Sequence, residues 1–554
     1  MLKRDRTATK TPAITELSGD PLSLAQFNGL VNQGGNVKLP LAAALQKKLA
    51  RSVDVVNDAL IDKEVIYGIT TGFGGMSNTR VDCQSAASLQ SNLLTFLAAG
   101  AGPEIDSKHT RGAMLLRANV LLQGKSGVRA EVVEQLLRFF AAGAVPVVRE
   151  LGSIGASGDL IPLSTIARAV TGSGRARVRF EDNEILDASQ ALDRLLLEPI
   201  NLRPKEGLAL INGTSFSCAI AANTTVAAKQ ALAISFAVEA MLMTALKVNP
   251  APFANFVHQA KPHPGQVWSA DTIRKLLSTE MPNAEAGEHV QDRYSLRCFP
   301  QYIGAIVEGI ARVGNVVEIE MNSVSDNPLI DAESRTFHQS GNFLGQYIGI
   351  AMDDLRRFIG LTAKHLDVQI ASLVAPEFNR GLSPSLRGSD ERSYNMGLKG
   401  LQICGNSIMP MLTWQANPIV EHFPTHAEQF NQNVNGLSWG AANMAWKSVE
   451  LFQQYLAVST LFAIQSVDLR AKQTLGHFDG RELLSEPTAE FYEAACEVID
   501  VKPDESRPMV LDDTDRWLEQ DIEGLAADIA SQGKLIDSVQ TITDDFADFC
   551  GSQA

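Results

Sequence analysis

Two long stretches of the chain contain neither glycine nor proline and are rich in apolar residues. They extend over residues 214–249 and 441–475. Apolar side chains around most of the circumference are typical of a helix that is buried on all sides. Helical periodicity also covers residues 301–322, 345–373 and 393–413. The pattern predicts a bundle of long helices, and helices this apolar favour a bundle that continues across subunits of an oligomer.

The first of these stretches is long enough to cross a membrane, which is the competing interpretation. Its apolar run is interrupted by polar and charged residues, among them Asn223, Lys229 and Glu239. Because a charged side chain is costly in lipid, a buried helix of the bundle is favoured over a membrane span.

The two ends of the chain differ from this middle part. The N-terminal part mixes short helical patterns with many glycines, and alternation over residues 175–180 before the turn-prone residues 181–183 predicts one short β-hairpin. Residues 510–554 are acidic and amphipathic and predict a peripheral helical cap. We therefore expect a mainly α fold in three parts, namely a smaller irregular N-terminal α+β region (1–205), a central long-helix bundle (206–480) and a C-terminal helical cap (481–554).

The composition excludes several classes of protein. A chain of 554 residues with 45% hydrophobic and 20% charged residues is typical of a globular protein, and wholesale disorder is excluded. The net charge of −15 argues against a nucleic-acid partner, which would need a basic face. Six singly scattered cysteines fit reduced thiols better than disulfides or a zinc site. The basic start, Lys3-Arg4-Asp5-Arg6, precedes polar residues, so we expect no secretory signal and a cytoplasmic protein.

Candidate chemistry lies in the tripeptide Ala156-Ser157-Gly158. In such a triplet the Gly158 nitrogen can attack the Ala156 carbonyl carbon. Loss of two waters, one from the Ser157 side chain, then leaves a methylidene group on an imidazolone ring. Glycine offers an unhindered nitrogen and tolerates the compressed dihedrals of ring closure. The product is an electrophile, which no ordinary side chain provides. Taken alone, the triplet more often marks a flexible turn, and Asp159 is expected to cap a helix that starts at Leu160.

Four further segments support the interpretation of the triplet as a cofactor precursor. They are Tyr67-Gly68-Ile69-Thr70-Thr71-Gly72-Phe73-Gly74, Asn212-Gly213-Thr214-Ser215, Gln291-Asp292-Arg293-Tyr294-Ser295-Leu296-Arg297 and Ala427-Glu428-Gln429-Phe430-Asn431-Gln432-Asn433-Val434-Asn435. With the triplet, and in this order, they resemble the aromatic amino acid ammonia-lyases and aminomutases, which share an autocatalytic methylidene-imidazolone (MIO) group.

The resemblance implies a histidine/phenylalanine ammonia-lyase-like fold and an MIO group formed from Ala156, Ser157 and Gly158. It further implies an aromatic amino acid substrate, no external cofactor, and a homotetramer whose active sites are shared between subunits. We expect no metal site, because Pro424 breaks the helix that would align His422 with His426.

The resemblance also implies roles for charged and phenolic residues. Tyr67 corresponds to the base that removes the β-proton, on a glycine-rich loop that acts as a lid. Because a tyrosine with a pKa near ~10 is a poor base at neutral pH, its phenolate must be stabilised by the site. Arg297 is expected to bind the substrate carboxylate in a bidentate pair. Tyr294 is expected near the electrophile and the amine, and Arg293 is expected to be structural.

The other implied site residues are polar or aromatic. Asn212 resembles the residue that hydrogen-bonds the imidazolone or the carboxylate. Glu428, Asn431 and Gln432 match the polar set that faces the amine and the new ring, and Phe343 resembles a residue that packs beside the electrophile. In an unrelated protein, such Asn and Gln residues would more often be capping or turn residues.

The substrate is read from the pair Phe96-Leu97, which aligns with the ring-facing pair of the family. Tyrosine-selective relatives have a histidine at the first position, and histidine-selective relatives have Ser-His. An apolar Phe96 offers no partner to a buried phenol hydroxyl, and an unpaired hydroxyl costs about 1–3 kcal/mol. We therefore expect phenylalanine as substrate, with some tyrosine turnover because apolar pockets reject a hydroxyl weakly.

The reaction has two candidates that share the elimination step. Residues 397–403 and 423–431 resemble bacterial 2,3-aminomutases more than plant lyases. We predict the lyase, which gives trans-cinnamate and ammonia, with a phenylalanine (or tyrosine) 2,3-aminomutase as the alternative. A hypothesis of another class is a catalytically inert helical assembly, whose mass would be unmodified.

Overall fold

A computed structural model describes residues 14–277, 290–389 and 391–553. The basic start of the chain, on which the expected cytoplasmic location rests, lies outside these residues. Contacts divide the chain into two units. The first contains residues up to Val226 together with Val316–Asp353 and Ile419–Asn443. The second contains Ala227–Asn315, Asp354–Pro418 and the residues from Met444 onward.

The first unit is built from short helices and very short strands. Its helices are α1 (Leu24–Val31), α2 (Ala43–Ile61), α3 (Ala86–Phe96), α4 (Ser107–Leu122), α5 (Ala130–Ala141), α6 (Leu160–Thr171), α7 (Ala188–Leu195) and α8 (Glu206–Ile211), with 3-10 turns at Gly74–Met76 and Val420–His422. The core of this unit includes α4, whose residues from Gly112 to Leu122 are all buried.

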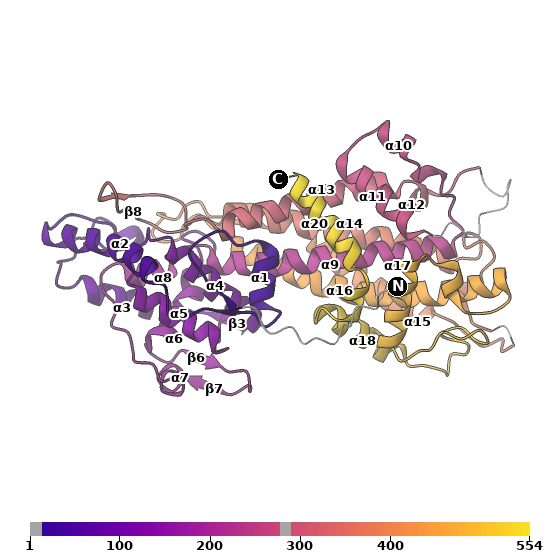
Figure 1. Cartoon of the computed structure of the whole chain (residues 1–554), viewed down its shortest axis with the longest axis horizontal. Helices are drawn as coiled ribbons and strands as arrows, with labels where there is room; N and C mark the ends of the chain where they lie inside the picture. The colour runs from indigo at the N-terminus through magenta and orange to yellow at the C-terminus, as the bar shows by residue number, and fades with distance from the viewer. Residues whose placement is uncertain (1–13, 278–289, 390, 554) are drawn as a thin grey trace. The chain divides into compact units, whose positions relative to one another are not determined.

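The strands among the described residues of the first unit form four small sheets. They are β1 (Ile14–Thr15), β2 (Asn36–Val37), β3 (Ala101–Glu104), β4 (Val145–Pro146), β5 (Arg149–Leu151), β6 (Arg177–Arg179), β7 (Ile185–Asp187), β8 (Leu329–Asp331) and β9 (Thr336–His338). The pair β1–β2 is parallel, whereas β3–β5, β4–β6–β7 and β8–β9 are antiparallel. The predicted hairpin is confirmed as β6–β7, which lies beside α7 (Figure 1).

Four long helices contain residues of both units. They are α9 (Ser215–Ala245), α13 (Phe299–Met321), α14 (Gln346–Val374) and α16 (Ser438–Leu475). Each follows a helical pattern predicted from the sequence, with ends displaced by four residues or fewer. The long-helix character of the fold is therefore confirmed.

Helix α9 is the predicted buried helix for which a membrane span was the alternative. Among the described residues it is the one helix long and apolar enough to cross a membrane, and 83% of its most apolar window is buried within the protein. This burial agrees with the interpretation as a core helix.

Helices are the regular elements of the second unit in its described residues, and no strand lies among them. Its remaining elements are α10 (Asn255–Gln259), α11 (Pro264–Leu276), α12 (Tyr294–Arg297), α15 (Lys399–Gln415), α17 (Glu486–Val498), α18 (Leu518–Ala530), α19 (Lys534–Ser538) and α20 (Gln540–Gln553), with 3-10 turns at Ala251–Phe253, Pro384–Leu386 and Gly480–Leu483. Helix α15 begins six residues later than the predicted 393. Gly397 has a φ of +62° there, a left-handed conformation that a continuous helix does not allow.

Candidate active site

The tripeptide Ala156-Ser157-Gly158 lies in a tight loop between β5 and α6. Ser153 closes the loop, because its hydroxyl donates to the Gly158 carbonyl (3.2 Å) and accepts from the Gly155 amide (3.1 Å). Ala156 and Gly158 are buried, and Ser157 is half-buried. The loop is thus bent back on itself before α6 begins.

The loop packs directly against the segment after α8. Gly158 pairs with Gly213 in an isolated parallel bridge, and the Asp159 amide donates to the Gly213 carbonyl oxygen (2.8 Å). A Cβ at Gly158 would lie 2.0 Å from that oxygen, and the φ of +68° is also unfavourable for other residues. Position 158 therefore accepts glycine only.

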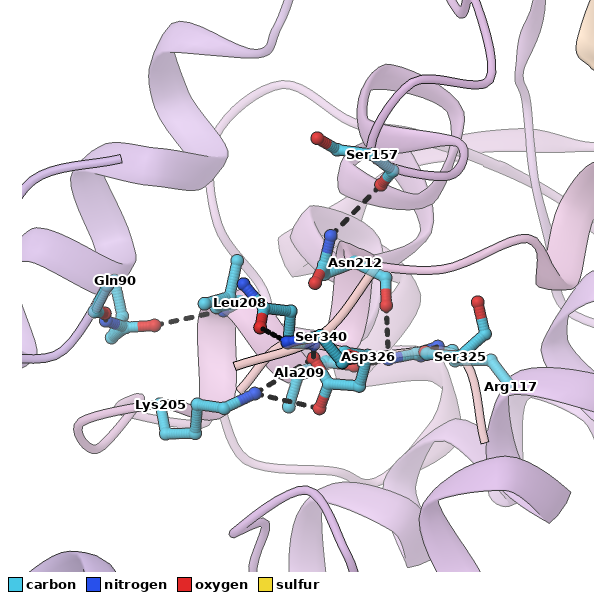
Figure 2. Close-up of polar contacts among 12 residues, drawn as sticks. Gln90, Arg117, Ser157, Lys205, Leu208, Ala209, Asn212, Ser325, Asp326 and Ser340 are labelled. Atoms are coloured by element: carbon cyan, nitrogen blue, oxygen red, sulfur yellow. Dashed lines mark hydrogen bonds and ion pairs between the residues drawn. The ribbon is translucent and has the colours of Figure 1, made fainter. Parts of the chain in front are cut away.

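Two amide side chains converge on Ser157. Asn212 Nδ2 donates to the Ser157 carbonyl oxygen (3.1 Å), as Figure 2 shows, and Gln432 Nε2 donates to the Ser157 hydroxyl (2.9 Å). The other end of the Asn212 amide, Oδ1, is buried and has no hydrogen-bond partner among the described residues. An acceptor left unpaired in this way is costly, so Asn212 Oδ1 can accept one further hydrogen bond.

Asp159 occupies the N-cap position of α6, but the predicted capping bond is absent. Its carboxylate instead accepts from the Ser217 amide (2.7 Å) in the first turn of α9, where the helix dipole favours negative charge. Burial raises the pKa of Asp159 to about 6. The cap prediction is therefore corrected, because the carboxylate serves a helix distant in sequence.

Tyr67 lies in a turn anchored by its neighbours. Ile66 and Ile69 belong to a buried apolar cluster with side chains of α2 and β8. The phenol oxygen of Tyr67 accepts from the Gly74 amide (3.0 Å). Burial raises the pKa of Tyr67 above its usual 10, the Gly74 amide opposes this, and the nearby Glu428 raises it further. Among the described residues, the Gly74 amide is the group that favours the phenolate expected from the sequence.

The segment that carries Glu428 has an unusual backbone. Glu428, Gln429 and Phe430 all have φ between +50° and +66°, and Ala427 bridges Gln432 across the loop. Consecutive left-handed residues other than glycine are strained and are found preferentially at functional sites. The loop brings Glu428 beside the Tyr67 turn and Gln432 beside Ser157, whereas the Asn431 side chain is exposed.

The aromatic and apolar site candidates of the first unit, Phe343, Phe96 and Leu97, make no side-chain hydrogen bond to the tripeptide. Phe343 is half-buried two residues before Gly345, whose amide donates to the Gly155 carbonyl (3.1 Å). Phe96 ends α3 and is 53% exposed, and Leu97 is buried and its carbonyl accepts from the Ser164 hydroxyl of α6 (3.2 Å). Phe343 is thus linked to the tripeptide loop through the backbone, and Phe96 faces outward from the chain.

Tyr294 and Arg297 belong to the second unit, on α12. The Arg297 guanidinium carbon lies 4.6 Å from the centroid of the largely exposed Tyr294 ring. Its Nε is buried without a hydrogen-bond partner among the described residues. Gln369 of α14 holds α12 by donating to the Ser295 carbonyl (2.9 Å). Arg293, expected to be structural, lies over the Phe378 ring at 4.0 Å.

The structure therefore brings together Tyr67, Ser157, Asn212, Glu428 and Gln432 within the first unit. Sequence reasoning missed the residues behind them, chiefly Arg117, which contacts the segment of Asn212. The signal available was a single arginine inside the apolar run 113–122. No group of three or more metal-binding side chains occurs in the part of the chain that the structure describes.

Comparison with known proteins shows the family to which the chain belongs. The family described as "Aromatic amino acid lyase" matches residues 22–497. The chain is 46% identical to a phenylalanine ammonia-lyase of Nostoc punctiforme, over 94% of this chain and 93% of that protein. It is 39% identical to an aromatic ammonia-lyase of Loktanella atrilutea, over 95% and 98% of the two chains. Its fold matches the tyrosine aminomutase of Streptomyces globisporus with a TM-score of 0.85 and 26% identity, over 96% of this chain and 99% of that one. The chain is therefore an enzyme of the aromatic amino acid lyase family.

Proposed function

We propose that the protein removes ammonia from L-phenylalanine to give trans-cinnamate, using an MIO group formed from Ala156, Ser157 and Gly158. The observation that carries the proposal is the convergence of Asn212 and Gln432 on the two oxygens of Ser157. Ser157 is the middle residue of the ring that would close between Gly158 and Ala156, and its hydroxyl is the group that would leave, so holding both of its oxygens would orient the tripeptide for these steps.

The surroundings of the tripeptide fit such a group. Gly158 has no space for a side chain, Asn212 Oδ1 is a buried acceptor without a partner among the described residues, and the loop is already tightly bent. The group supplies an electrophile for the substrate amine, with negative charge accepted by the former Ser157 carbonyl oxygen. Asn212 Nδ2 already donates to this oxygen and would stabilise that charge.

The chain's own residues would bind the substrate and move its protons. Arg297 binds the carboxylate through a planar, bidentate guanidinium, and Tyr294 lies beside it. Tyr67 removes the β-proton, for which its phenolate must form despite the effect of burial and of Glu428 on its pKa. Glu428, Asn431 and Gln432 face the amine, and Phe343 packs beside the tripeptide.

The choice of phenylalanine rests on Phe96 and Leu97, neither of which offers a hydrogen bond from its side chain to a substrate hydroxyl. The name of the Nostoc relative supports the same substrate. The structural likeness to a tyrosine aminomutase supports the alternative, in which the amine returns to the β-carbon and a β-amino acid forms.

We further propose a cytoplasmic homotetramer with shared active sites. Phe96 and Tyr294 are 53% and 73% exposed in the single chain, although aromatic side chains of a substrate pocket are normally enclosed. Neighbouring subunits would supply the missing walls.

The test is a time course with L-phenylalanine that quantifies cinnamate and β-phenylalanine together. The lyase predicts cinnamate from the first time point, and early excess of β-phenylalanine would identify a mutase. Intact mass gives an independent check, because the MIO group lowers it by about 36 Da, the mass of two waters, and Ser157→Ala abolishes the loss. An unmodified wild-type mass would contradict the proposal.

A further inference from the structure

Arg117 is a fully enclosed charge close to the proposed catalytic loop. It lies on α4 among apolar residues and is 1% exposed. Burying a guanidinium away from water is costly unless its donors and its charge are both satisfied. The contacts of Arg117 therefore show which groups satisfy its donors and its charge, and which parts of the chain it joins.

The guanidinium donates to three backbone carbonyl groups. Nε donates to Ala209 (2.8 Å), Nη1 to Ser325 (2.9 Å) and Nη2 to Asn212 (3.2 Å). Ala209 lies within α8 and Asn212 comes directly after it, while Ser325 comes shortly after α13. The planar fork thus fixes the C-terminal end of α8 against the segment of Ser325 (Figure 2).

The start of α8 is fixed to the same segment. Lys205, directly before α8, forms a fully buried ion pair with Asp326, with Nζ 2.8–2.9 Å from the two carboxylate oxygens. Burial lowers the pKa of Arg117 to about 10, and the charges of Asp326 and Asp159 limit the decrease. Two buried cations therefore hold α8 at both ends, and Arg117 stays charged at neutral pH.

The two residues directly after α8 form the platform for the tripeptide. Asn212 donates to the Ser157 carbonyl, and Gly213 pairs with Gly158 so closely that a Cβ at Gly158 would overlap its carbonyl group. Gly213 is confined from its other side, where a Cβ would lie 2.5 Å from both Arg117 Nη1 and the Ser325 carbonyl oxygen. The loop of Ser157 thus rests on Asn212 and Gly213, which rest on Arg117.

We propose that Arg117 is a positioning residue for ring closure, a role that rests on the proposed function. In this step a bond forms between the Gly158 nitrogen and the Ala156 carbonyl carbon, and the Ala156 oxygen leaves as water. Ser157 then loses its hydroxyl and its α-hydrogen as a second water. Arg117 touches none of these atoms. It keeps Asn212 and Gly213 in place, so that the loop stays compressed and the reacting atoms stay near each other.

The test is the intact mass of the full chain, followed over time after synthesis, for wild type and Arg117→Lys. Lysine keeps the charge but lacks the planar fork that reaches three carbonyls. We expect the loss of two waters to slow by about tenfold or more, since small displacements of reacting atoms have large effects on rate. A species that retains one or both waters should accumulate in the folded protein.

Arg111→Lys is the matched control. Arg111 lies on the same helix and also donates to three backbone carbonyls, those of Phe140, Leu30 and Gly35, away from the tripeptide. Its variant should lower the unfolding temperature without slowing the mass loss. If Arg117 has a purely structural role, Arg117→Lys will also lower the unfolding temperature without slowing the mass loss. That outcome would overturn the inference.

If Arg117→Lys does not fold, Gly213→Ala addresses the same contact, because its Cβ would press on Arg117 Nη1 and on the Ser325 carbonyl oxygen that accepts from it. Complete and rapid mass loss in folded Gly213→Ala would equally overturn the inference. Failure of the wild-type chain to lose two waters would instead contradict the proposed function, so the two failures are distinguishable.

Discussion

Tyr67 is acted on by two neighbours with opposite effects. The Gly74 amide donates to the phenol oxygen at 3.0 Å and favours the phenolate, whereas the negative charge of Glu428 disfavours it. With burial added, the balance raises the pKa of Tyr67. If Tyr67 is the base, activity depends on the small fraction that is ionised at neutral pH.

Glu428→Gln is therefore expected to lower the pKa of Tyr67, because a neutral amide no longer opposes the phenolate. The acidic limb of the kcat/KM profile should move to lower pH, while kcat should fall because Glu428 is also proposed to face the amine. The measurement is a pH–rate profile of both proteins with L-phenylalanine.

The exposed Glu421, in the turn Val420–His422, provides the control as Glu421→Gln, which should leave the limb in place. A limb that stays fixed or moves to higher pH in Glu428→Gln would show that Glu428 does not tune the base.

At the scale of elements, a buried ion pair joins α9 and α14 within the second unit. His365 Nδ1 lies 2.7 Å from Glu239 Oε1, and both residues are almost fully buried. Burial lowers the pKa of His365, but the charge and hydrogen bond of Glu239 outweigh this effect, so the pKa is raised above 6.5. The pair thus favours the protonated imidazole in the folded state.

This pair makes stability depend on pH in a defined direction. The stabilisation is fully present below the unfolded pKa of His365 and is lost as pH rises through the higher folded pKa. We expect His365→Gln to remove this part of the fall in unfolding temperature above about pH 6.5. Thermal unfolding of both proteins across this range is the measurement.

His477→Gln serves as the control, since the Nε2 of His477 lies 3.6 Å from Glu482, which is largely exposed. His477→Gln should show the same dependence of the unfolding temperature on pH as the wild type. Parallel curves for wild type and His365→Gln would contradict the assignment.

The helices and their contacts differ in how well the sequence predicts them. The helices α9 and α16 were predicted within four residues, because apolar composition without glycine or proline is a local signal. The start of α15 was missed because the left-handed Gly397 is a matter of backbone conformation. The partner of Asp159 was missed because Ser217 lies 58 residues away. Arg117 stands out as an arginine inside an apolar run, but its role was missed because its backbone carbonyl acceptors leave no mark in the sequence.

At the scale of the whole molecule, exposed apolar side chains of the second unit bear on the proposed tetramer. Helix α14 exposes Leu361 and Val368, and α15, which Arg356 of α14 contacts at the Gln415 carbonyl, exposes Ile403, Met411 and Trp414. If these side chains form a contiguous surface, a contact with another subunit is its expected use, because monomers rarely expose large apolar patches. The proposed tetramer would bury them and would combine the first unit of one chain with Arg297 of another.

Shared sites have a consequence that a mixing experiment can detect. On the proposed roles, Ser157→Ala and Arg297→Met should each abolish activity, because the first would not form the MIO group and the second would not bind the substrate carboxylate. In co-expressed mixtures, a site is intact when its tripeptide comes from the Arg297→Met chain and its arginine from the Ser157→Ala chain. With random assembly this applies to about one quarter of the sites, so about a quarter of wild-type activity should return.

The matched control mixes Ser157→Ala with Asn212→Ala. Asn212 contacts Ser157 within one unit of one chain, so every tripeptide environment in this mixture carries a defect and no activity should return. If each site were instead complete within one chain, the Ser157→Ala and Arg297→Met mixture would also stay inactive. Recovery in the first mixture together with none in the second is therefore the pattern that only a site shared between subunits produces.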